Sequence, residues 1–328
     1  MYSCLPFFYH PTTVLYLDDG SHADQVKVLS LKCPIKFISG LNKQEFVQMI
    51  KQNVALQAST HRHFEYLEEE ELETYRVSVN LQDIYKVIYS ESRFDRISTV
   101  IVDHNAVGNS FEFLGNIQQA PVKKILLIND SDQSLAIEAF NLGLIDACIS
   151  KQQNNFDKVL QETVEKCQES YFVALSKYVE VFFSPMDRKK SALYSEEFRS
   201  YFKNIIKTHN IKEFYLLERQ GSFLCLDEQG NHGVLATQSQ ETLESFLESQ
   251  EAITADPIIL KTLKEGSHIL CYKNLTETFL PIGSRWVDYV FKADCFKEND
   301  ETFLCAYVLG QFGLRKEHLK TFQPSNNE

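Results

Sequence analysis

The stretch Thr99-Val100-Ile101-Val102-Asp103 is a compact apolar run that ends in a carboxylate. Three more stretches have the same form: Val14–Leu17 before Asp18-Asp19, Ile125–Ile128 before Asn129, and Ala147–Ser150 before Lys151. Apolar runs of this length are typical of strands buried on both faces of a parallel sheet. Ligands bind at the carboxyl edge of such sheets. The four stretches therefore predict a parallel sheet that gathers acidic residues and one lysine at this edge.

Carboxylates crowded at one edge of a sheet repel one another, which raises a pKa or recruits a cation. Mg²⁺ suits such a site best, because it takes oxygen ligands, needs few carboxylates and keeps several waters. The ammonium group of Lys151 adds a point charge that can bind an anion such as a phosphoryl group. The residue types therefore predict a site for Mg²⁺ and a phosphoryl group.

The order and spacing of these pieces resemble the receiver domain of two-component response regulators. The matching residues are Leu15-Tyr16-Leu17-Asp18-Asp19, Val100-Ile101-Val102-Asp103, Lys124-Ile125-Leu126-Leu127 and Ile149-Ser150-Lys151. Residues 136–143, Ala-Ile-Glu-Ala-Phe-Asn-Leu-Gly, are similar to the fourth helix of the family and its glycine exit. The resemblance covers roughly the first 170 residues and implies a flavodoxin-like, doubly wound parallel sheet.

The resemblance also implies a role for each residue at the edge. Asp103 would accept a phosphoryl group from a sensor histidine kinase, and Lys151 would pair with the phosphoryl charge. Asp18 and Asp19 would hold Mg²⁺ together with Asp103 and the backbone carbonyl of Asn105. Such a protein catalyses little beyond its own phosphorylation and hydrolysis, so we do not expect an enzyme with an external substrate.

Three positions depart from the receiver pattern. The family usually has Thr or Ser at the end of the fourth strand, where this chain has Ile128 or Asn129, depending on the direction of counting. Neither has a hydroxyl, although the amide of Asn129 can donate a hydrogen bond to the phosphoryl group. Cys148 stands where an aromatic switch residue is usual, and Gln152 stands in place of a proline. We therefore expect intact phosphorylation chemistry with an unusual readout.

The composition of the chain limits which binding partners and which cellular compartment we expect. The net charge of −12 argues against broad binding to nucleic acid, which needs a basic surface. The eight cysteines include no C-x-x-C pair, which fits free thiols in a reducing cytoplasm. No apolar run approaches 18 residues and no basic region precedes an apolar one at the N-terminus, so we expect neither a membrane span nor a signal peptide.

A chain of 328 residues is expected to form two domains. We predict a receiver domain over 1–183, enlarged by an insertion at about 40–98, and an α+β output domain over 184–328. In the insertion, Leu81, Ile84, Tyr85 and Ile88 fall on one helical face, which predicts a helical excursion that packs on the sheet or on a partner copy. His61 and His63 lack further ligands nearby for a metal site.

The segment from about 155 to 181 has apolar residues at the a and d positions of a heptad repeat. They are Leu160, Val164, Cys167, Tyr171, Ala174, Tyr178 and Val181. This pattern predicts a long helix that pairs with a second copy of the chain. Its first half is also expected to pack on the receiver sheet as an ordinary fifth helix. We therefore predict a homodimer that strengthens on phosphorylation.

The last third of the chain predicts an antiparallel α+β domain, with strands around a glycine turn at 219–221 and helices near 196–209, 240–251 and 257–264. From residue 195 onward, 14 basic residues stand against 20 acidic ones, and no helix-turn-helix with a basic helix is visible. This part resembles the output domain of the LqsR-type quorum-sensing response regulators. That likeness implies control of gene expression or of a population-density programme.

Two other functions compete with phosphoryl signalling. A pseudo-receiver would keep the fold as a phosphorylation-independent interaction scaffold, and it would not bind beryllofluoride with Mg²⁺. A phosphate-ester hydrolase of the haloacid-dehalogenase kind needs a second acid two residues after the first. Asp103-His104-Asn105 lacks that acid, which disfavours a hydrolase.

Overall fold

The computed structural model describes residues 5–18, 20, 33–57, 64–69, 74–79, 81–180, 183, 188–248, 257–271, 287–298, 301–310 and 312–322. These residues form two compact units that alternate along the chain. One unit contains residues 10–61, 90–175 and 322–328, and we call it the receiver unit. The other contains residues 1–9, 62–89 and 176–321, and we call it the output unit.

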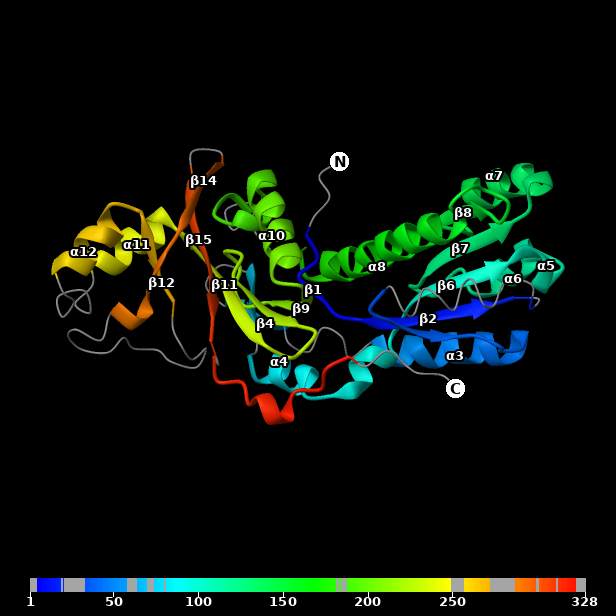
Figure 1. Ribbon diagram of the computed structural model, residues 1–328, viewed down its shortest axis with the longest axis horizontal. Coiled ribbons are helices and arrows are strands. Elements are labelled where there is room, and N and C mark those ends of the chain that lie inside the picture. Colours follow the sequence, from blue (N-terminus) through cyan, green and yellow to red (C-terminus); the bar gives the residue numbers. More distant parts are fainter. Residues whose placement is uncertain are drawn as a thin grey trace. The chain divides into compact units, whose positions relative to one another are not determined.

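The receiver unit is built on a five-stranded parallel sheet, as predicted (Figure 1). Its strands are β2 (Thr12–Leu17), β3 (Ile35–Ile38), β6 (Ile97–Asp103), β7 (Lys123–Ile128) and β8 (Ala147–Ser150). Their order in the sheet is β3-β2-β6-β7-β8. Numbered within this unit, that is 2-1-3-4-5, the order of flavodoxin-like folds. The predicted receiver fold is confirmed.

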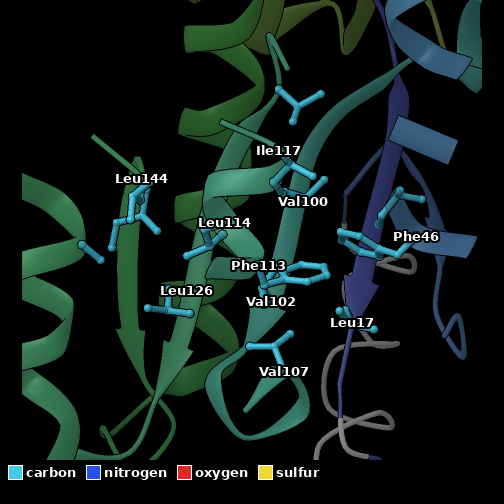
Figure 2. Close-up of a cluster of buried hydrophobic side chains, with 14 of the residues drawn as sticks. Leu17, Phe46, Val100, Val102, Val107, Phe113, Leu114, Ile117, Leu126 and Leu144 are labelled. Carbon is cyan, nitrogen blue, oxygen red and sulfur yellow. The ribbon is translucent and has the colours of Figure 1, made fainter. Parts of the chain in front are cut away.

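Helices cover both faces of this sheet because side chains from alternate strand residues are buried on both faces. One core joins strand residues such as Val100 and Val102 to α3 (Lys43–Gln57), α6 (Ser110–Asn116) and α7 (Gln133–Asn141). Figure 2 shows part of this core, with Phe46 and Phe113 beside the strands. The other core joins the intervening residues, among them Ile101, to α8 (Phe156–Glu180). Each buried large apolar side chain stabilises the fold by about 1.5–3 kcal/mol.

The output unit is an antiparallel α+β domain, as predicted. Its six-stranded sheet has the order β1-β9-β10-β11-β15-β14. The bounds are β1 Phe8–Tyr9, β9 Ile211–Leu216, β10 Phe223–Asp227, β11 His232–Ser239, β14 Asp294–Glu298 and β15 Glu301–Leu309. A separate pair joins β12 (His268–Leu270) to β13 (Val290–Lys292), and the helices are α10 (Glu196–Thr208), α11 (Gln240–Leu247) and α12 (Pro257–Lys264). Ser239 caps α11 by accepting a hydrogen bond from the backbone of Thr242.

The insertion differs from the predicted helical excursion. It contains a hairpin of β4 (Phe64–Glu69) and β5 (Thr74–Val79) before α4 (Leu81–Ile88). The backbone groups of β4 and β5 form their hydrogen bonds with each other, so the helix is limited to α4. Residues 62–89 also belong to the output unit, although we predicted them within the receiver domain.

The start of the chain also lies in the output unit. β1 pairs with β9, with Phe8 opposite Tyr215, and the backbone N–H of Leu216 donates to the carbonyl of Phe7. The division in space is therefore not the predicted split between residues 183 and 184. Strand pairing joins segments far apart in sequence, and a local pattern does not specify the partner of a strand.

The predicted heptad seam is mostly buried within the chain. Leu160, Val164 and Cys167 of α8 belong to the core on the receiver sheet, and Tyr171 is 1% exposed. Further along α8, Ala174 is exposed and so is Tyr178, while Phe172, Leu175 and Val179 are buried. An α-helix drifts about 20° per heptad from a 3.5-residue repeat, so the buried stripe leaves the predicted positions after Tyr171. Most of the seam is therefore not available to a second copy.

Some predictions fall on residues outside those that the structure describes. They are the metal ligand Asp19, the seam residue Val181 and the two histidines His61 and His63. Among the helices that the structure does describe, none is long and apolar enough to cross a membrane.

Candidate functional site

Asp103 is the last residue of β6 and lies at the carboxyl edge of the receiver sheet. Its side chain is fully buried, and its Oδ1 accepts a hydrogen bond of 2.9 Å from the backbone N–H of Asn105. Asp103 is also the N-cap of the short helix α5 (His104–Val107), so its carboxylate faces backbone donors. The chain leaves β6 at this residue, which fixes the carboxylate at the edge.

Lys151 follows β8 directly and reaches Asp103 two strands away in the sheet. Its Nζ lies 3.1 Å from Oδ1 and 2.9 Å from Oδ2 of Asp103. The side chain of Lys151 is only 3% exposed. Burying either charge alone would carry a large desolvation penalty. The attraction between the two charges at this distance offsets that penalty. The structure thus brings together the predicted phosphoacceptor and the predicted lysine.

Asp18 lies just beyond β2, which pairs in parallel with β6. Leu17 is opposite Val102 in this pairing, so Asp18 and Asp103 follow the same register position on adjacent strands. Asp18 is half-buried, whereas Asp19 is outside the residues that the structure describes. Carboxylate and backbone oxygens are the donors that Mg²⁺ prefers, so the residue types at this edge suit the ion. Within the described part of the chain, no three His, Cys, Asp or Glu side chains group as a metal site.

Asn129 follows β7 and makes a contact that the sequence pattern did not predict. Its Oδ1 accepts a hydrogen bond of 3.0 Å from Nε2 of Gln152. Gln152 also accepts a 3.0 Å hydrogen bond from the backbone N–H of Asp130. The only sequence signal for this contact was a long polar residue where the family has proline. Gln152 is therefore a candidate site residue that sequence reasoning missed.

Cys148 in β8 occupies the position of the usual aromatic switch residue. Burial raises the pKa of its thiol to about 11. The thiol therefore stays protonated near neutral pH, and Cys148 packs against the apolar core beside α7. A small side chain at this position cannot swing between two positions as a large ring can. The unusual readout therefore stays a prediction.

Comparisons with known proteins bear on the whole chain. No family model matches the chain, and no curated protein matches it. Among solved structures, the response regulator LqsR of Legionella pneumophila is similar over 98% of this chain and 95% of its own, with 25% identity and a TM-score of 0.76. The chain has the architecture of a response regulator. Receiver unit and output unit both fall within this match.

Two further solved structures are less similar to this chain. An adenylate cyclase from Rhodopirellula baltica is 13% identical, with a TM-score of 0.34, over 53% of this chain and 97% of its own. The signal receiver domain of an HD domain-containing protein from Pseudomonas fluorescens Pf-5 is 17% identical, with a TM-score of 0.29, over 49% of this chain and 89% of its own. Both scores are too low to support a functional conclusion.

Proposed function

We propose that the chain takes a phosphoryl group on Asp103 from a sensor histidine kinase and transmits that signal through its output unit. The observation that supports this proposal most directly is the buried pair in which Nζ of Lys151 contacts both carboxylate oxygens of Asp103. A buried lysine held on a nucleophilic carboxylate can stabilise the added negative charge of a phosphoryl group. The similarity to a response regulator over 98% of the chain adds to it.

In the proposed reaction, a carboxylate oxygen of Asp103 attacks the phosphorus of a phosphohistidine. The O–P bond forms as the P–N bond breaks, and the departing imidazole takes up a proton. Lys151 then pairs with the phosphoryl oxygens in place of the free carboxylate. Asp18, Asp19, Asp103 and the backbone carbonyl of Asn105 would hold Mg²⁺. When bound, the ion would neutralise charge between the carboxylates and the phosphoryl oxygens.

The consequence of phosphorylation is proposed to be a change in self-association in the cytoplasm. Of the predicted seam on α8, Ala174 and Tyr178 are exposed and lie one helical turn apart. We propose that these two residues contribute to a homodimer that strengthens on phosphorylation. The change in self-association would in turn regulate gene expression as part of a quorum-sensing response. Direct nucleic-acid binding is not part of the proposal, since the net charge is −12.

Phosphorylation can be tested with acetyl phosphate and Mg²⁺ on the full chain. We expect label on wild type and none on Asp103→Asn, because the substitution removes the nucleophile. Asp95→Asn is the matched control, since Asp95 is an exposed partner of Lys36 rather than part of the site. Label on Asp103→Asn equal to that on wild type would contradict the assignment. If wild type takes no label and binds no beryllofluoride, the chain is a scaffold rather than a switch.

A further inference from the structure

The side chain of Gln152 bridges two loop ends beside the site. Its Oε1 accepts from the backbone N–H of Asp130 at 3.0 Å, and its Nε2 donates to Oδ1 of Asn129 at 3.0 Å. Asn129 and Asp130 follow β7, whereas Gln152 follows β8. One amide therefore ties together the carboxyl ends of two neighbouring strands.

These contacts determine the orientation of both amide groups. A backbone N–H can only donate, so the atom of Gln152 that faces Asp130 must be the oxygen. The other end of the Gln152 amide is then the NH₂ group, and the atom of Asn129 that faces it must be an acceptor. Oδ1 of Asn129 is thereby engaged by Gln152. The NH₂ group of Asn129 is the end left to bind another ligand.

Neighbouring contacts hold Gln152 in this position. Its backbone N–H donates to Oγ of Ser150 at 3.2 Å, and Ser150 in turn donates to the carboxylate of Asp130. The backbone N–H of Lys151 donates to the carbonyl of Ile128 at 2.8 Å, which joins the same two strand ends. The bridge is therefore anchored through both backbone and side-chain atoms.

Asn129 also lies on the face of the sheet that carries the site. Asp103 is opposite Leu127 in the pairing of β6 with β7. Asn129 comes two residues later and keeps extended backbone angles, with φ of −87° and ψ of 162°. Side chains two residues apart in an extended strand point to the same face. Asn129 thus falls on the same face as Asp103.

We infer that Gln152 is a positioning residue, which holds Asn129 so that its NH₂ group, and not its carbonyl oxygen, meets a phosphoryl group on Asp103. This inference rests on the proposed phosphorylation of Asp103. Phosphoryl oxygens only accept hydrogen bonds, so an NH₂ group stabilises them and a carbonyl oxygen repels them. Asn129 would then replace the usual hydroxyl, and Gln152 would supply the orientation that a hydroxyl does not need.

The inference can be tested by following the rate at which acetyl phosphate with Mg²⁺ labels the full chain. Gln152→Met removes both hydrogen bonds, and we expect labelling about three- to tenfold slower, in line with partial loss of a hydrogen bond to a charged group. In Gln152→Glu the new carboxylate can only accept, so Asn129 should turn its NH₂ group away from the site and labelling should be slower still. Gln161→Met is the matched control, because Gln161 makes an exposed hydrogen bond to Glu165 on α8.

A double substitution separates positioning from general destabilisation. In an Asn129→Ala background, Gln152→Met should slow labelling no further, because its effect acts through Asn129. Additive slowing, or wild-type labelling by Gln152→Met, would overturn the inference while leaving phosphorylation of Asp103 intact. Absence of label on wild type would instead overturn the proposed function. Because Gln152 is exposed, Gln152→Met should hardly change the temperature of thermal unfolding. If Gln152→Met does not fold, the labelling rate of Gln152→Glu provides the same test.

Discussion

At the scale of single residues, Asp103 and Lys151 form a buried ion pair in the receiver unit. Both side chains are almost inaccessible, at 0% and 3% exposure. Burial of one charge is costly unless its partner stays in place. The same contact that suits phosphoryl chemistry therefore also makes each residue necessary to the other for stability.

Replacing Lys151 tests this dependence. Lys151→Met should lower the free energy of unfolding by about 3–5 kcal/mol, because the carboxylate of Asp103 is left buried without a counter-charge. The double variant Lys151→Met with Asp103→Asn should recover much of that loss, since no buried charge remains. Urea unfolding of the three proteins measures both effects. A Lys151→Met variant as stable as wild type would show that the pair is not buried as described.

At the scale of elements, α8 shows that a heptad pattern can arise from packing within one chain. Its first part packs on the receiver sheet through Leu160 and Val164, which are fully buried. Beyond Tyr171, the buried stripe turns away from the predicted seam and leaves Tyr178 62% exposed. The helix is therefore a core element first, and a dimer contact can involve only its exposed residues.

Substitutions on α8 should separate these two roles. Tyr171→Glu places a carboxylate in a site that is 1% exposed, so we expect loss of several kcal/mol of folding stability in the monomer. Tyr178→Glu should leave stability nearly unchanged and weaken the association of the phosphorylated chain. Analytical ultracentrifugation with and without beryllofluoride gives the test.

A surface residue on α7 provides the comparison. Phe140 is 60% exposed, and Phe140→Glu changes a similar apolar area to the same charge. If Phe140→Glu abolishes association while Tyr178→Glu does not, the dimer contact lies on α7 and our assignment to α8 is wrong. If wild type stays monomeric in every condition, the proposed dimer does not exist.

At the scale of the whole molecule, residues 62–89 of the insertion belong to the output unit, whereas the rest of it belongs to the receiver unit. The hydroxyl of Tyr85 in α4 donates to the carbonyl of Phe312 at 3.2 Å. The backbone N–H of Arg315 donates to the hydroxyl of Tyr89 at 3.1 Å. These hydrogen bonds attach α4 and the residue that follows it to a segment of the output unit more than 220 residues later in the chain.

Paired core substitutions test this membership. Ile84 of α4 and Ile50 of α3 are both fully buried, at 0% and 1% exposure, but they lie in different units. Each Ile→Ala change should cost about 2–5 kcal/mol locally. Hydrogen exchange should speed up in β9–β11 for Ile84→Ala and in β6 and β7 for Ile50→Ala. Faster exchange confined to β6 and β7 in Ile84→Ala would assign α4 to the receiver unit instead.

Much of the receiver fold could be predicted from the sequence. Strands buried on both faces leave apolar runs, and a polar residue such as Asp103 or Lys151 ends each run where the sheet meets solvent. This signal is local, because it depends only on whether each residue is buried. The strand order then follows from the resemblance to receivers. The sequence by itself thus determined the sheet and the candidate phosphoacceptor.

Only the tertiary structure decided which segments share a unit and how the site is braced. The pairing of β1 with β9 and the attachment of α4 to Phe312 join residues that no local pattern relates. The bridge from Gln152 to Asn129 likewise needs two strand ends to lie side by side. The periodicity of apolar residues indicates that a side chain is buried, but it does not indicate which residues the side chain packs against. Those packing partners depend on contacts between distant parts of the chain.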